Sequence, residues 1–241
     1  MTALLASVTN IDEARLVSQS GVNIIDLKNP LKGALGALTD TEICGIVSEL
    51  NGVTTVSATI GDLPFKKAEI RKPVLQMQKS GVDIIKIGVF GDVNNRETLS
   101  FLSQLASRGS RFVLVFFAED LPDVIDFASL KAGGIHGVMI DTRNKQDGNL
   151  RAKITIESLR EFCSRAREND LLCGLAGSIG VSDIPALLAL QPDYLGFRGA
   201  LCRGGARTGQ LSEQALQRIR QMIPQDFDKS DLIIANQAND L

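Results

Sequence analysis

The stretch written NIIDLKNP, residues 23–30, places a carboxylate and an amine two positions apart inside an apolar segment. Side chains two apart on a strand leave from the same face, so Asp26 and Lys28 point together, away from Ile25 and Leu27. Burying such a pair in an otherwise apolar strand is costly, which favours a chemical role. We interpret Asp26 and Lys28 as catalytic residues.

Later segments carry further ionisable groups at or just beyond their ends, namely Lys86 in IIKIG, Asp141 at the end of GVMID, and Lys145 in the loop that follows. Burial and neighbouring ammonium groups both lower the pKa of a lysine, so such a cluster provides some neutral amine near neutral pH. A neutral amine attacks a carbonyl and forms a Schiff base, while a second lysine or a carboxylate moves protons. A purely structural ion-pair network is the alternative interpretation.

Two glycine-rich segments, 176–180 (AGSIG) and 198–205 (RGALCRGG), indicate an anion site. Glycine lets backbone N–H groups approach an anion, and the loops after the last two strands of a barrel commonly bind phosphate. The candidate phosphate ligands are Gly177, Ser178, Arg198, Gly199, Arg203 and Gly204. Lys32, Lys66 and Lys67 are candidates for a second phosphate, with solvated surface lysines as the alternative.

The elements that position these residues alternate regularly along the chain. Strands are expected at 1–8, 23–30, 54–59, 83–87, 112–117, 137–141, 172–175 and 194–197. Helices are expected to end near 19 and 50, and then to span about 70–80, 97–107, 124–131, 156–169, 181–190 and 212–222. Strands that alternate with helices pair in parallel through right-handed crossovers. The sequence therefore predicts the α/β class, a single (β/α)8 TIM barrel over 1–223 with a polar tail at 224–241; a doubly wound sheet is the alternative.

Composition narrows the classes of partner. The 241 residues carry a net charge of −2 with both signs scattered, so we expect no nucleic acid partner. No apolar run approaches the ~20 residues of a membrane span, and the chain starts without a basic leader, so we expect a cytoplasmic protein and no membrane contact. The expected partners are a small-molecule substrate and further copies of the chain in a homo-oligomer.

Cofactor motifs are missing from the sequence. It contains no phosphate-binding GxxxxGK[ST], no strand-linked GxGxxG and no HExxH. The one histidine, His136, lies in a loop-like GGIHG, and the four cysteines show no CxxC spacing. We therefore expect no metal, no redox cofactor and free thiols.

The chain resembles the (5-formylfuran-3-yl)methyl phosphate synthase family in the segments IIDLKNPLKGALGA, SATIGDLPFK, IIKIGVFG, IDTRNKQDG, CGLAGSIG and GFRGALCRGG. The resemblance implies a TIM-barrel lyase that condenses two molecules of glyceraldehyde 3-phosphate, a triose phosphate, with loss of phosphate and water, for methanofuran-type cofactors. It also implies Lys28 as the Schiff-base nucleophile, with Asp26 beside it, and Lys86 as the proton acceptor. Asp141 and Lys145 match the family's aspartate and lysine of the sixth strand and its loop.

Three other functions remain open on the residues alone. An orotidine-monophosphate-decarboxylase type of barrel also uses an Asp-x-Lys strand, but it needs an aspartate where this chain has Leu31. A simple class I aldolase would use one Schiff-base lysine and make no furan. A non-catalytic phosphosugar sensor would keep the glycine-rich loops without needing Lys28 and Lys86 together.

Overall fold

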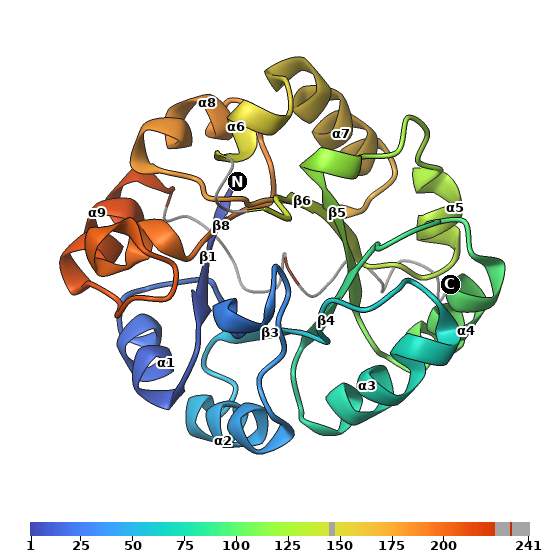
Figure 1. Ribbon diagram of the computed structural model, residues 1–241, viewed down its shortest axis with the longest axis horizontal. Coiled ribbons are helices and arrows are strands. Elements are labelled where there is room, and N and C mark those ends of the chain that lie inside the picture. Colours follow the sequence, from blue (N-terminus) through green and yellow to red (C-terminus); the bar gives the residue numbers. More distant parts are fainter. Residues whose placement is uncertain (145–147, 225–231, 233–241) are drawn as a thin grey trace.

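Eight parallel strands form a closed barrel in chain order in the computed structural model, which describes residues 1–144, 148–224 and 232 (Figure 1). The strands are β1 (Ala3–Val8), β2 (Ile24–Leu27), β3 (Thr55–Thr59), β4 (Ile84–Gly88), β5 (Phe112–Phe117), β6 (Gly137–Asp141), β7 (Leu172–Leu175) and β8 (Tyr194–Phe197). Pairing of Ala3 with Tyr194 closes the barrel between β1 and β8. The predicted (β/α)8 barrel is confirmed, and a doubly wound sheet is excluded.

Helices form the outer ring around this barrel (Figure 1). In the described residues they are α1 (Ile11–Ser18), α2 (Asp40–Leu50), α3 (Lys67–Lys79), α4 (Arg96–Ala106), α5 (Phe127–Ala132), α6 (Leu150–Lys153), α7 (Ile156–Glu168), α8 (Ile184–Leu188) and α9 (Glu213–Met222). A capping box begins α2, because the Thr39 and Glu42 side chains each accept from the other's backbone N–H.

Strand periodicity separates the two faces of the barrel wall. Ile25 and Leu27 belong to the large apolar cluster between the strands and the helices. Ile24 belongs to a second cluster inside the barrel. Asp26 and Lys28 follow Ile24 at spacings of two and point inward with it, as the alternation predicts.

Two helical segments differ from the sequence prediction. The loop expected from 142 to 155 contains the short helix α6, whose start is capped by the Asn149 side chain, an acceptor for the N–H of Ala152. The single helix expected over 181–190 divides into a 3₁₀ turn, Val181–Asp183, and α8. Pro185 lies in the first turn of α8, where its missing N–H costs nothing.

Leu232 closes the interior of the barrel at the end where the strands begin. Its side chain is fully buried and packs in the interior cluster with Ala3, Ile24 and Tyr194. Its backbone oxygen lies 2.7 Å from Nε2 of His136, the residue just before β6. The tail, polar in most of its sequence, has a short apolar stretch at 232–234, and Leu232 packs on the chain's own barrel. Residues 233 and 234 lie outside the described residues.

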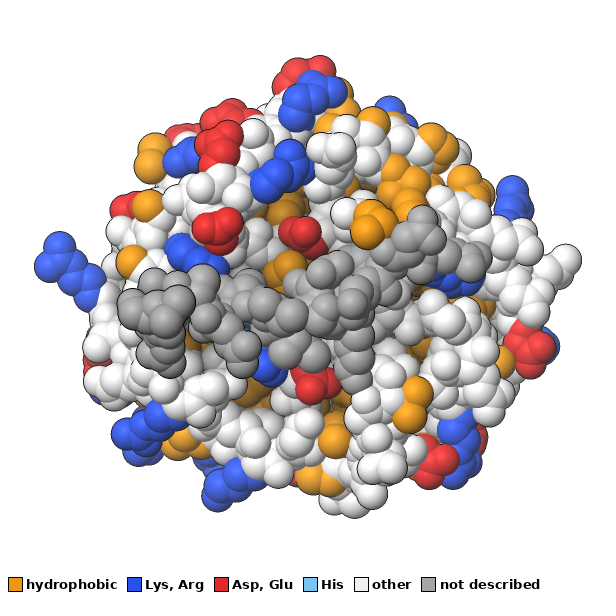
Figure 2. All heavy atoms as spheres, turned by 180° about the vertical axis from the view of Figure 1, so that it is seen from behind, with side chains coloured by type: hydrophobic (Ala, Val, Ile, Leu, Met, Phe, Trp, Pro, Cys, Tyr) orange, Lys and Arg blue, Asp and Glu red, His pale blue; other side chains and the backbone are white. Residues whose placement is uncertain are grey.

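Charge on the surface is mixed. On the face shown in Figure 2, Lys and Arg side chains and Asp and Glu side chains are both scattered over the surface. Among the described residues, no helix is both long and apolar enough to cross a membrane.

Candidate active site

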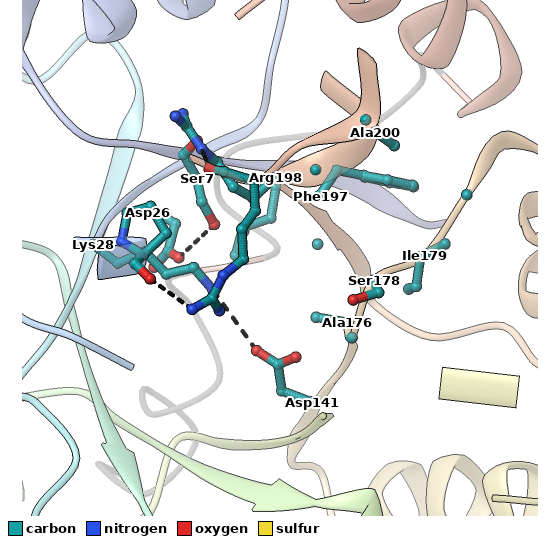
Figure 3. Close-up of a pocket in the computed structure, with 18 of the residues that line it drawn as sticks. Ser7, Asp26, Lys28, Asp141, Ala176, Ser178, Ile179, Phe197, Arg198 and Ala200 are labelled. Carbon is teal, nitrogen blue, oxygen red and sulfur yellow. Dashed lines mark hydrogen bonds and ion pairs between the residues drawn. The ribbon is translucent and has the colours of Figure 1, made fainter. Parts of the chain in front are cut away.

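A cavity of about 610 Å³ lies where the strands end, and strands β1, β2, β4, β6, β7 and β8 or the loops after them all contribute to its wall. Its lining includes Asp26, Lys28, Lys86 and Asp141, and Figure 3 shows Asp26 and Lys28 from β2 on the same cavity as Asp141 from β6. The volume falls in the range of pockets that enclose a small organic ligand. The expectation that these four side chains meet is confirmed.

Asp26 is completely buried and accepts three hydrogen bonds. Oδ1 accepts from Nζ of Lys86 at 2.7 Å and from Oγ of Ser57 at 2.8 Å, and Oδ2 accepts from Oγ of Ser7 at 2.9 Å. Both serines stand beside Asp26 in the parallel ladder, Ser7 on β1 and Ser57 on β3. The sequence analysis missed them, although an inward-facing serine on each neighbouring strand was a usable indication.

The Asp26 carboxylate stays ionised despite its burial. Burial alone would raise the pKa of Asp26, but the Lys86 and Lys28 ammonium groups and the hydrogen bonds from Lys86 and Ser57 outweigh it. The pKa of Asp26 is therefore below its usual value. With both oxygens occupied, this carboxylate is suited to hold a neighbouring amine in place.

Lys86 is also buried, and its pKa is lowered from the usual lysine value. Burial is the main cause, and repulsion from Lys28 adds to it, while attraction to Asp26 and Asp141 opposes the shift. A lowered pKa increases the fraction of neutral amine, which is the form that accepts a proton. Lys86 thus has the environment of a general base.

Lys28 lies nearer the mouth of the cavity. Its Nζ is 3.7 Å from Oδ2 of Asp141, with side-chain exposures of 10% and 3%. The other oxygen of Asp141 accepts from the N–H of Thr142 at 2.7 Å. The predicted site residue Lys145 lies outside the described residues.

Backbone N–H groups line the opposite part of the wall. In the described structure, the N–H groups of Gly177, Ser178 and Ile179 donate to no acceptor, and neither do those of Gly199 and Ala200. Gly177 and Ser178 have φ of 111° and 52°, a run of positive values that turns consecutive N–H groups to one side. These amides form an anion-binding arrangement, which we call the amide nest.

Arg198 does not fit the predicted phosphate role. Its Nε donates to the oxygen of Arg207, Nη1 to the oxygen of Ser7 and to Glu13, and Nη2 to Glu13 and to the oxygen of Gly209. A guanidinium has five N–H groups, so none is left for a ligand. The prediction is corrected: Arg198 braces the loop after β8 against β1 and α1.

The other predicted residues of this loop divide into two groups. Gly199 lines the cavity, whereas Arg203 and Gly204 are exposed and do not line it. Arg207, which the sequence analysis did not single out, does line it. Arg207 lies nine residues after Arg198, in a loop without a periodic pattern from which the direction of its side chain could be predicted.

Comparison with known proteins gives one consistent family. A family model described as 4-HFC-P synthase matches residues 4–220. A protein of Methylorubrum extorquens named "Putative (5-formylfuran-3-yl)methyl phosphate synthase" is 39% identical over 223 residues, covering 90% of this chain and 91% of the relative. The (5-formylfuran-3-yl)methyl phosphate synthase of Methanosarcina acetivorans is 31% identical, with coverage of 85% and 92%.

Solved structures share the fold at low sequence identity. Phosphoribosyl anthranilate isomerase from Thermotoga maritima superimposes with a TM-score of 0.65 at 11% identity, covering 92% of this chain and 98% of its own. A 3-hexulose-6-phosphate synthase superimposes with a TM-score of 0.60 at 17% identity, covering 92% and 100%. At these identities the likeness concerns the barrel alone.

Proposed function

Because the chain belongs to the 4-HFC-P synthase family and is an enzyme, we propose that it condenses two molecules of glyceraldehyde 3-phosphate into (5-formylfuran-3-yl)methyl phosphate. In this proposal the reaction runs through a Schiff base on Lys28, releases one phosphate and water, and serves the synthesis of a methanofuran-type cofactor.

The observation that carries the proposal is the buried double pair of Lys86 with Asp26 and Lys28 with Asp141. The free energy needed to desolvate four ionisable groups exceeds the free energy gained from their mutual attraction, so a purely structural role does not explain their burial. An amine chemistry explains the cost, because burial is what produces a neutral lysine.

The first step forms one bond and loses water. The Lys28 nitrogen attacks the aldehyde carbon of one triose phosphate, and loss of the carbonyl oxygen as water gives the imine. The carboxylate of Asp141, close to Nζ, is placed to accept a proton from the amine and return it to the departing oxygen.

Lys86 carries the next proton. Its neutral amine removes the proton from the carbon next to the imine, and the resulting enamine adds to the aldehyde of the second triose phosphate. Asp26 holds Lys86 in place and is itself held by Ser7 and Ser57. Phosphate elimination, ring closure and dehydration then give the furan, and the amide nest holds one phosphate.

Borohydride trapping tests the imine. We expect wild-type protein with glyceraldehyde 3-phosphate to give a reduced adduct on Lys28, together with near-ultraviolet furan absorbance and released phosphate. Lys28→Arg removes the nucleophile while keeping the charge, so the adduct and the furan are expected to vanish. Intact mass and peptide mapping locate the adduct.

Lys79→Arg, at an exposed lysine at the end of α3, is the matched control and is expected to behave as wild type. Trapping without furan would favour a simple class I aldolase. Binding with neither adduct nor absorbance would refute the Schiff base and favour a sensor or decarboxylase-like function. The decarboxylase-like alternative is already disfavoured, because it needs an aspartate at position 31. This chain has a leucine there, and that leucine is 80% exposed.

A further inference from the structure

Arg207 extends from the loop between β8 and α9 to the loop that follows β2. Its Nη2 lies 2.6 Å from the backbone oxygen of Pro30 and 3.5 Å from that of Gly33. These two contacts hold the guanidinium beside the end of the strand that carries Lys28. Arg207, Pro30 and Lys28 all line the same cavity.

The guanidinium of Arg207 still has donors to offer. Nε and Nη1 donate to no residue within the described part of the chain, which leaves three of the five N–H groups. The other described cations of the cavity are engaged: Lys86 and Lys28 with carboxylates, and Arg198 through all its N–H groups. Arg207 has no carboxylate partner among the described residues.

The chemistry of an imine-bound triose defines where its phosphate lies. The phosphorus is four bonds from the imine carbon, so the phosphate stays near the end of the strand that carries Lys28. A planar guanidinium with adjacent N–H groups matches two phosphate oxygens. We propose that Arg207 binds the phosphate of the triose phosphate held by Lys28, through Nε and Nη1; this rests on the proposed function.

This assignment divides the two substrates between two anion sites. The amide nest belongs to the loops after β7 and β8, whereas the Arg207 guanidinium is held at the loop after β2. The nest is then free for the phosphate of the second triose. Two separate sites suit a condensation in which both partners are phosphorylated.

Arg198 prepares the Arg207 loop before substrate arrives. It donates to the backbone oxygens of Arg207 at 2.8 Å and Gly209 at 3.0 Å, while Glu13 neutralises its charge. The loop is therefore braced at Arg207 itself and two residues later, which reduces the cost of ordering it on binding. Arg198 is a positioning residue and Arg207 the ligand.

The rate of borohydride trapping on Lys28 tests the assignment with a phosphorylated and an unphosphorylated aldehyde. For Arg207→Gln we expect trapping of limiting glyceraldehyde 3-phosphate to slow by about 10- to 100-fold, the effect of losing charge-assisted hydrogen bonds. Trapping of glyceraldehyde, which has no phosphate, is expected to be unchanged. Arg207→Lys keeps the charge without the paired donors and is expected to lie between the two.

Two further arginines provide the comparison. Arg218→Gln, at an exposed position on α9, is expected to match wild type. An equal slowing with both aldehydes in Arg207→Gln would overturn the proposal, because it would mean that Arg207 only supports the loop. A selective loss with Arg203→Gln and none with Arg207→Gln would overturn it as well.

Calorimetry with glycerol 3-phosphate separates this proposal from the Schiff base, because that probe has no carbonyl. If wild type gives no adduct with either aldehyde, the proposed imine fails on its own. Arg207 is then judged by the probe: affinity at least about 10-fold weaker in Arg207→Gln supports the phosphate site. Equal affinity in the two proteins overturns it.

Discussion

Asp26 controls the charge of Lys86 at the level of single residues. The carboxylate accepts from Ser7, Ser57 and Lys86, and its own pKa is lowered although burial acts to raise it. It thus remains an anion through the working range of pH. Lys86 is buried against this anion, and attraction to it opposes the lowering of the lysine pKa by burial.

Asp26→Asn is expected to lower the pKa of Lys86 further. The substitution removes the attraction that favours the charged amine, while burial and Lys28 continue to disfavour it. The acidic limb of the pH profile, where Lys86 gains a proton and stops acting as a base, then moves to lower pH. Titration of the lysine side-chain nitrogens by nuclear magnetic resonance measures this directly.

Asp40→Asn is the control, because Asp40 is exposed at the start of α2 and is not among the groups that act on the pKa of Lys86. It is expected to leave the Lys86 titration in place. A Lys86 pKa that stays the same or rises in Asp26→Asn would show that the carboxylate does not set it.

Residue types and strand spacing were enough to predict which ionisable side chains line the cavity. The period of two is local, so Asp26, Lys28 and Lys86 face inward wherever their strands stand in the barrel. The partners of Arg198 were not predictable in this way. Glu13 is 185 residues away along the chain, and only the closed barrel brings it against the guanidinium.

On the scale of secondary-structure elements, the Arg198–Glu13 pair joins the loop after β8 to α1. The side chains are 7% and 12% exposed, and Nη1 of Arg198 lies 2.6 Å from Oε2 of Glu13. The same carboxylate oxygen accepts from the N–H and the hydroxyl of Thr9. One glutamate therefore joins the end of β1, the start of α1 and the loop after β8.

Glu13→Gln is expected to lower the free energy of unfolding by about 3 kcal/mol, because it leaves a buried guanidinium without a counter-charge. Affinity for glycerol 3-phosphate is expected to fall too, since the loop that carries Arg207 loses its brace. Urea unfolding and calorimetry measure the two effects.

Glu49→Gln breaks the pair between Glu49 and Arg15, whose side chains are 38% and 50% exposed. A surface pair of this kind contributes at most about 1 kcal/mol to the free energy of unfolding, so we expect little change in this control. Similar losses in both variants would mean that the burial of Arg198 has no energetic consequence.

The ends of four strands followed from the sequence, whereas one short helix did not. The bounds of β5, β6, β7 and β8 agree with the prediction, because buried runs flanked by glycine, proline and polar residues are unambiguous. Helix α6 was missed, since four residues carry no helical period. The cap supplied by Asn149 was the one local indication of its start.

On the scale of the whole molecule, the two ends of the barrel differ: one end holds the ionisable cavity and the other is closed by apolar side chains. The ionisable side chains of the cavity occupy the end where the strands finish, and Leu232 fills the end where they start, together with Ala3, Ile24 and Tyr194. Substitutions at the end where the strands start can therefore change the stability of the barrel without altering the chemistry at the other end, as in other barrels of this class.

Leu232→Ala is expected to lower the free energy of unfolding by about 2 to 5 kcal/mol, the cost of a cavity at a fully buried leucine. Affinity for glycerol 3-phosphate should stay within experimental error. Val53→Ala, at a side chain that is 74% exposed, is the control and should change stability by less than about 0.5 kcal/mol. Weakened ligand binding in Leu232→Ala would contradict the independence of the two ends.

Pairing between β1 and β8 also has a consequence for the synthesis of the protein on the ribosome. The partner of Ala3 is Tyr194, about 190 residues later, and synthesis at ~5–20 residues per second takes about 10 to 40 s to reach it. Throughout that interval the first strand, apolar at nearly every position, has one edge without a partner. The nascent chain is thus most vulnerable to aggregation before its last strand emerges, and rapid shielding of its first strand protects the yield of active protein.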